Sequence, residues 1–163
     1  MGLEEAKEVL NLQLDWNRSA DARVPILFAI CSAIIGSGVA FLKPTSEWSN
    51  LYLIVIALFF IFIFTSVVFL AMIIWPRTAS TTKSNIYFGE ISSLNRNTYI
   101  ENFKSTSPEE HLEDILSQIH INASIAKTKY EGLGTSYIST IMALPFWLLI
   151  IIFNFEVFSA PIG

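Results

Sequence analysis

The side chains that most often carry chemistry are few in this sequence and are badly spaced for it. His111 and His120 lie nine residues apart on one predicted helix, with no cysteine beside them. A zinc site needs three or four ligands, usually at closer spacing, so we interpret both histidines as surface residues. The sequence contains no glycine-rich phosphate loop and no nucleophile motif. We therefore expect a protein that is not an enzyme and that holds no metal and no resident cofactor.

One polar stretch nevertheless has a composition that suggests binding or order. Residues 83–103, KSNIYFGEISSLNRNTYIENF, include Tyr87, Phe88 and Tyr99 together with two positive charges. The stretch is too polar to cross a bilayer and too rich in aromatic residues for a loose loop. We expect it to form a small ordered element between membrane segments.

The overall composition indicates a membrane protein. Of the 163 residues, 53% are hydrophobic and 15% are charged, whereas soluble domains carry about a quarter charged residues. The net charge of −4 argues against a nucleic acid as partner, because nucleic-acid binders concentrate positive charge. The single cysteine, Cys31, lies in an apolar run and is expected to be a small buried side chain.

Three uncharged apolar runs are long enough to cross a bilayer as helices. They comprise residues 24–42, 51–75 and 137–155, with lengths of 19, 25 and 19 residues. A helix needs about 20 residues to cross the hydrocarbon region. The polar segment 43–50 between the first two runs is short, so these runs are predicted to form a helical hairpin.

The positive charges predict an orientation. Three lysines and arginines precede the first run, one lies between the first two, six lie between the second and third, and none follows. Because positive charge stays on the cytoplasmic side, we expect the N-terminus and the long middle segment in the cytoplasm and the C-terminus outside.

Small residues recur on the first apolar run at helical spacing. They are Ala29, Ser32, Ala33, Gly36 and Ala40. Small side chains allow close approach of helices in lipid. The stripe therefore predicts either packing against another span of the same chain or self-association, and the pattern does not choose between them.

The polar segments are also predicted to be helical. Residues 1–23 place Leu3, Ala6, Leu10 and Leu14 near one face of a helix, which we expect to pack on the other cytoplasmic parts. A further short helix is predicted from about Asn97 to Phe103.

A longer helix is predicted to begin at Ser107, because Ser107, Pro108 and Glu110 have the pattern of a capping box. Apolar residues follow at steps of four and three, and Gly132 is placed to end the helix. Such a seam buries itself against the N-terminal helix or against copies of the chain. The seam consists of Leu112, Leu116, Ile119, Ala123, Ala126 and Tyr130.

The predicted fold is an all-α membrane protein with three transmembrane helices and a small helical cytoplasmic layer. The layer consists of the N-terminal helix and the segment between the second and third spans. The predicted parts are 1–23 (cytoplasmic helix), 24–42 and 51–75 (transmembrane helices), 76–135 (cytoplasmic sensor segment) and 137–157 (transmembrane helix).

Four short motifs follow one another along the chain. They are Ala20-Asp21-Ala22-Arg23 before the first span, Tyr87-Phe88-Gly89 after the second, Tyr99 in a short helix, and Lys129-Tyr130 before the last span. In these motifs and their order, the chain resembles the transmembrane effectors of bacterial Pycsar anti-phage systems. Arg23 stands where the family usually has lysine. Pro25 follows it closely, which predicts an interrupted entry into the first span.

The resemblance implies a function. A partner cyclase makes cyclic CMP or cyclic UMP, and the effector binds this signal on its cytoplasmic side. The effector then forms a homo-oligomer and impairs the inner membrane, which causes abortive infection. The implied partners are the lipid bilayer, the cyclic nucleotide as signalling ligand, and other copies of the chain.

For such a ligand, aromatic rings would stack on the base and polar side chains would meet the phosphate. The implied ligand-binding residues are Lys83, Asn85, Tyr87, Phe88, Arg96 and Tyr99. An alternative is that Phe88 and Tyr99 are only the core of this element. Asp21 and Arg23 are candidates for a structural ion pair. A second functional hypothesis is a membrane scaffold that binds a protein partner through the seam of the long helix.

Overall fold

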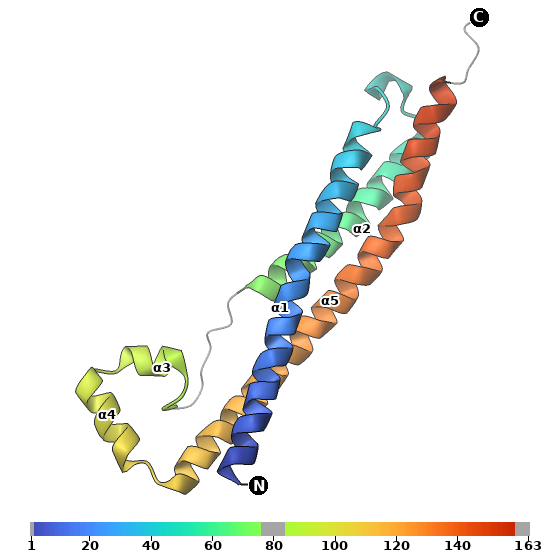
Figure 1. The fold of residues 1–163 in the computed structure, drawn as a ribbon. Helices are drawn as coiled ribbons and strands as arrows, with labels where there is room; N and C mark the ends of the chain where they lie inside the picture. The colour runs from blue at the N-terminus through green and yellow to red at the C-terminus, as the bar shows by residue number, and fades with distance from the viewer. Residues whose placement is uncertain (1, 76–83, 159–163) are drawn as a thin grey trace, which may run out of the picture. The chain divides into compact units, whose positions relative to one another are not determined.

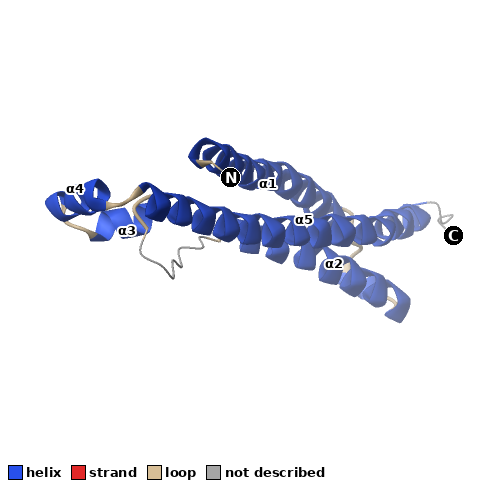
Figure 2. Cartoon of the chain, turned by 90° about the horizontal axis from the view of Figure 1, so that it is seen from below, coloured by secondary structure: helices blue, strands red, loops and turns tan. Residues whose placement is uncertain are grey.

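The computed structural model of the protein describes residues 2–75 and 84–158. These residues form helices and loops and contain no strand (Figure 2). The elements are α1 (Leu3–Ala40), the 3-10 helix η1 (Thr45–Glu47), α2 (Asn50–Ile74), α3 (Phe88–Ser93), α4 (Arg96–Ser105) and α5 (Pro108–Phe158) (Figure 1).

Three of these helices, α1, α2 and α5, are long and apolar enough to cross a membrane. The prediction of an all-α protein with three candidate spans is therefore confirmed for the described residues. The cytoplasmic placement of the other helices stays a prediction.

Contacts divide the chain into two compact units. The first, called here the polar unit, consists of Met1–Ala20 and Trp75–Lys129. The second, called the apolar unit, consists of Asp21–Ile74 and Tyr130–Gly163. Helices α1 and α5 each begin in the polar unit and end in the apolar unit.

In the apolar unit, α1 and α2 form the predicted hairpin, and α5 packs against both. The backbone N–H of Lys43 donates to the hydroxyl of Tyr52 at 3.1 Å, close to the turn. Gly38 lies where the helices approach one another closely. A Cβ at this position would lie 2.9 Å from Cζ of Phe59 on α2 and 3.5 Å from Cδ1 of Trp147 on α5. Glycine therefore allows the three helices to meet.

A buried polar layer joins the three helices of the apolar unit. The hydroxyl of Ser66 on α2 lies 2.7 Å from that of Ser136 and 2.8 Å from that of Thr140, both on α5. Cys31 of α1 places its Sγ 3.4 Å from the Ser66 hydroxyl. All four side chains are buried, which confirms the expectation for Cys31. The layer satisfies its own donors, as burial in an apolar environment requires.

The predicted interruption at Pro25 is wrong, because α1 is continuous from Leu3 to Ala40. Proline removes one backbone hydrogen bond from a helix interior. Here the flanking residues Ala20, Val24 and Leu27 are all buried. Their packing energy holds the helix together through the proline.

The prediction that Gly132 ends a helix is also wrong. Helix α5 continues to Phe158, and no described glycine has a positive φ. Gly132 instead permits close packing within the apolar unit, since a Cβ there would lie 3.1 Å from Cγ1 of Ile73 on α2. Tertiary contact, and not chain reversal, explains this glycine.

In the polar unit, the first part of α1 packs on α5, as predicted for the N-terminal helix. Nδ2 of Asn17 donates to the carbonyl oxygen of Asn122 at 3.0 Å and to that of Gln13 at 3.1 Å. Ala6 and Ala20 are fully buried on the same helix. Small side chains and an amide therefore make much of this interface.

The predicted seam of α5 is only partly correct. Within the polar unit the buried positions are Ile115, Gln118 and Ala126, while Leu116 is 40% exposed. Most other seam residues are half-buried. The buried stripe is displaced because Gln118 is held inside by a hydrogen bond from its Nε2 to Ser84 at 3.2 Å. Apolar spacing alone does not reveal such a polar contact.

Candidate functional site

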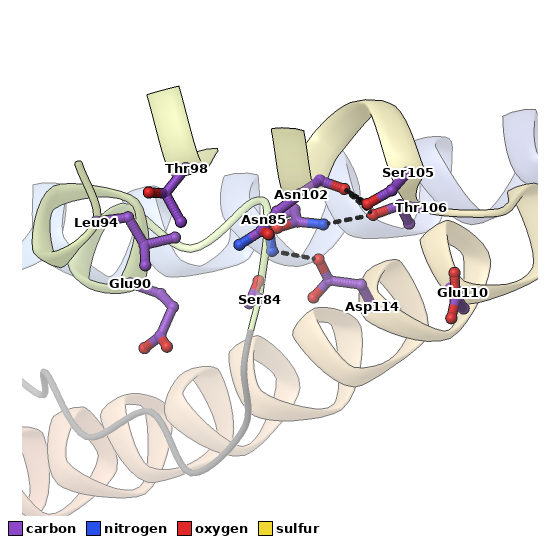
Figure 3. A pocket seen from close by; sticks show the side chains of 10 residues that line it. All are labelled: Ser84, Asn85, Glu90, Leu94, Thr98, Asn102, Ser105, Thr106, Glu110 and Asp114. Carbon is purple, nitrogen blue, oxygen red and sulfur yellow. Dashed lines mark hydrogen bonds between the residues drawn. The ribbon is translucent and has the colours of Figure 1, made fainter. Parts of the chain in front are cut away.

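A polar pocket lies in the polar unit, where the segment before α3 meets α3, α4 and the start of α5 (Figure 3). It has a volume of about 580 Å³. Helix α4 presents one face to it through Thr98, Asn102 and Ser105, which follow helical spacing. The other lining residues are Ser84, Asn85, Glu90, Leu94, Thr106, Glu110 and Asp114.

Asn85 holds the walls of the pocket together. Its backbone N–H donates to Oδ2 of Asp114 at 2.8 Å, and its Nδ2 donates to Oγ1 of Thr106 at 2.8 Å (Figure 3). Its carbonyl oxygen accepts from the hydroxyl of Tyr99 at 3.3 Å. One residue thus connects the segment before α3 with α4, the following turn and α5.

Ser84 is the buried support behind this segment. Its Oγ accepts from the backbone N–H groups of Ile86 and Tyr87, at 3.2 and 3.0 Å, and from Nε2 of Gln118. These bonds fix the chain at the entry to α3. Tyr87 itself supplies no side-chain cap to α3, so the local bonds of Ser84 and its tertiary contact with Gln118 hold the start of this short helix.

The capping box at the start of α5 forms as predicted. Oε2 of Glu110 accepts from the backbone N–H of Ser107 at 2.7 Å, and Oγ of Ser107 accepts from the backbone N–H of Glu110 at 3.2 Å. The hydrogen bond from the Ser107 backbone, and then that with its side chain, lowers the pKa of the Glu110 carboxyl below its ordinary value of 4.5. Glu110 is therefore charged at neutral pH on the rim of the pocket.

The pocket has an acidic and hydrogen-bond-accepting character. Its lining includes the carboxylates of Glu90, Glu110 and Asp114, four hydroxyl groups and two amides, and it includes no lysine, arginine or aromatic residue among the described residues. Within the described chain, no group of three or more metal-ligating side chains is placed to hold an ion.

Of the predicted ligand-binding residues that the structure describes, only Asn85 lines this pocket. Tyr99 lies behind it, half-buried, with its ring 6.0 Å from that of Phe103. The ring of Phe103 lies 5.9 Å from that of His111, so Tyr99 belongs to a small, partly exposed cluster of rings. This supports the alternative that Tyr99 has a structural role. Arg96 is exposed on α4 and outside the lining.

The aromatic pair Tyr87 and Phe88 also lies outside the lining. Their ring centroids are 4.9 Å apart, and Phe88 is 67% exposed. Gly89 is required next to them, because a Cβ there would lie 2.5 Å from Cε1 of the Tyr87 ring. The Tyr-Phe-Gly motif is thus a local packing unit with one ring presented outward. Lys83 lies outside the described residues.

Sequence reasoning missed most of the residues that form the pocket. The capping pattern identified Glu110 as a helix-start residue, and the spacing of four places Asp114 on the same helix face, but nothing in the sequence related either of them to Glu90. The missed lining residues are Ser84, Glu90, Leu94, Thr98, Asn102, Ser105, Thr106, Glu110 and Asp114.

The predicted ion pair between Asp21 and Arg23 stays a prediction. The guanidinium of Arg23 lies over the ring of Tyr130 at 5.6 Å from the ring centroid. This cation–π contact joins α1 to α5 within the apolar unit. The motif that ends at Arg23 and the motif that ends at Tyr130 are therefore in contact.

Comparison with known proteins gives one match. The family model described as the Pycsar effector protein domain matches residues 5–155. Neither a curated protein nor a solved structure matches the chain.

Proposed function

The chain belongs to the Pycsar effector family, and on this premise we propose that a cyclic pyrimidine nucleotide switches it from a resting to a membrane-impairing state. The family makes it a membrane effector of an anti-phage system. The proposed signal is cyclic CMP or cyclic UMP. The proposed outcome is oligomerisation, damage to the bacterial inner membrane and abortive infection.

The family match over residues 5–155 is the observation that carries this proposal. The matched domain is not a known enzyme family, which supports a role without catalysis. The orientation predicted from the lysines and arginines would expose the polar unit to a cytoplasmic signal. The pocket of the polar unit is a candidate for the signal site, and Lys83, Tyr87, Phe88 and Arg96 stay candidates from the sequence.

The surface of α1 supports self-association. All members of the small-residue stripe are exposed, and a Cβ at Gly36 would meet nothing within 4 Å. Packing within one chain therefore does not use the stripe. Helices from two copies of the chain could approach closely in lipid through such a surface. The stripe consists of Ala29, Ser32, Ala33, Gly36 and Ala40.

Ligand binding can drive such a change only if the ligand binds one state more tightly. Helices α1 and α5 each pass through both units. A shift of α5 at the pocket would thus be transmitted along a continuous helix into the apolar unit.

The proposal is tested by calorimetric titration of the detergent-solubilised chain. We expect heat on addition of cyclic CMP or cyclic UMP and none with cyclic AMP or cyclic GMP. The same pyrimidine nucleotide should release dye from liposomes that contain the protein. Folded protein that binds no cyclic nucleotide would contradict the proposal.

The partly exposed seam of α5 favours one alternative, a membrane scaffold. Leu116 is 40% exposed, and its neighbours Leu112 and Ile119 are half-buried. A scaffold would retain a specific protein partner through this surface and would give no nucleotide response. For a scaffold, Leu116→Lys should abolish capture of the protein partner, and neither the wild-type chain nor this variant should bind a cyclic nucleotide in titrations.

A further inference from the structure

The chemistry of the residues that line the pocket limits which chemical groups of a ligand the pocket can bind. Three carboxylates face a cavity that no described cation lines. Placing a phosphate there would bring like charges together, which is unfavourable at short distance. A metal ion is not favoured either, because the described acidic side chains do not converge on one point. The lining instead suits a group that is rich in N–H and O–H donors.

Resting on the proposed function, we infer that this pocket binds the nucleoside part of the cyclic nucleotide and selects cytosine over uracil. Carboxylates accept hydrogen bonds from the exocyclic amino group of cytosine. Uracil carries a carbonyl oxygen at the same ring position. That oxygen would face the carboxylates as a second acceptor and leave both without a donor.

The carboxylates have oxygens available for this role. Asp114 uses Oδ2 for the N–H of Asn85, and Glu110 uses Oε2 for the N–H of Ser107. The carboxylate of Glu90 makes no hydrogen bond within the described part of the chain. Glu90 is half-buried at the other end of the cavity from Asp114 (Figure 3). The amino group of a base and the hydroxyl of a ribose can therefore be bound by different carboxylates.

Arg96 lies on a different side of α4 from the lining residues. It is two residues from the lining residue Thr98, which corresponds to about 200° around a helix. Lys104 is one residue, or about 100°, from the lining residue Ser105 and so lies at the edge of that face. A phosphate bound by Arg96 would lie away from the lining. The phosphate group therefore faces out of the pocket while the nucleoside faces in.

The inference is tested by calorimetric titration of the full-length chain in detergent with cyclic CMP, cyclic UMP, cytidine and uridine. We expect the wild-type chain to bind cyclic CMP about tenfold more tightly than cyclic UMP, as one good base contact provides. Cytidine should compete with cyclic CMP better than uridine does.

Variants locate the preference in the pocket. Glu90→Gln should lower the affinity for cyclic CMP about tenfold and raise that for cyclic UMP, because an amide at this position can donate to the uracil oxygen. Glu101→Gln is the matched control, because Glu101 is exposed on α4 outside the lining. Asp114→Asn is a second pocket variant. Its effect is measured as the ratio of the affinity for cyclic CMP to the affinity for cyclic UMP.

The outcomes separate this inference from the proposed function. Equal affinity for the two nucleotides, or a preference for cyclic UMP, would overturn the inference and leave the proposed function standing. A cytosine preference that Glu90→Gln and Asp114→Asn both leave unchanged would also overturn it. A folded wild-type chain that binds neither nucleotide would overturn both.

Discussion

At the scale of the residue, the side chains that matter most are polar groups in buried places. Ser66 is fully buried in the apolar unit and contacts partners on the two other helices. Asn85 has the corresponding role in the polar unit, where it connects three segments. Both side chains act through hydrogen bonds whose loss leaves other buried groups without a partner.

Replacement of Ser66 tests the buried polar layer. We expect Ser66→Ala to lower the free energy of unfolding by about 0.5–2 kcal/mol, the range for an interhelical hydrogen bond in lipid and for a buried polar group left unpaired. The measurement is unfolding of the reconstituted chain by denaturing detergent. Ser32→Ala is the control, because Ser32 is exposed and bonds only to the carbonyl of Phe28. Equal effects of the two changes would contradict a special role for the layer.

At the scale of the element, α5 joins the two units as one helix of 51 residues. Two features explain its start and its continuity. The capping box of Ser107 and Glu110 fixes the first turn. Packing of Gly132 against Ile73 keeps the helix continuous where glycine would favour an end.

The first turn of α5 should loosen in acid. The pKa of Glu110 is lowered in the folded chain, so its contribution is complete above about 4.5 and is lost as the pH falls through the folded pKa. The protection of the backbone N–H groups of the first turn, measured as their exchange rate relative to the intrinsic rate at each pH, should decrease below about pH 4.5. Glu110→Gln should remove this pH dependence while keeping the capping bond. A turn whose exchange shows the same pH dependence in both proteins would contradict the assignment.

The two glycines near the middle of α5 should respond oppositely to alanine. A Cβ at Gly134 would meet nothing within 4 Å, so Gly134→Ala should stabilise the helix by up to about 1 kcal/mol through helix propensity. Gly132→Ala should give no gain or a loss, because its Cβ would lie 3.1 Å from Ile73. Thermal unfolding in detergent measures both. A larger gain at Gly132 would show that α2 and α5 do not approach closely there.

At the scale of the whole molecule, the proposed switch requires copies of the chain to associate. We expect Gly36→Leu to leave the fold intact and to reduce nucleotide-dependent oligomers, because a large side chain would separate helices that pack through the small-residue stripe. Chemical cross-linking in liposomes measures the oligomers.

The control for this experiment makes the same exchange elsewhere. Gly134→Leu also enters open space, but on α5 and outside the stripe. It should leave the oligomers unchanged. Unaltered cross-linking in Gly36→Leu, with a nucleotide response retained, would exclude the stripe as the contact between copies.

The sequence by itself determined the class of the protein and its main helices. Long uncharged runs predict spans because a bilayer tolerates few charges, and the start of α5 was predictable because Ser107 and Glu110 form a local hydrogen-bond pattern. These features depend on neighbours within a few residues. They can therefore be read without knowing the fold.

Only the tertiary structure decided how distant residues meet. Glu90 and Asp114 belong to different helices, and no pattern in the chain brings their carboxylates to one pocket. Likewise, Pro25 and Gly132 have local preferences that oppose a helix, yet buried neighbours and close contact with Ile73 outweigh them. Packing energies summed over many atoms exceed the roughly 1–3 kcal/mol that a single glycine or proline costs a helix. Helix continuity and the chemistry of the pocket therefore follow from contacts that the sequence does not display.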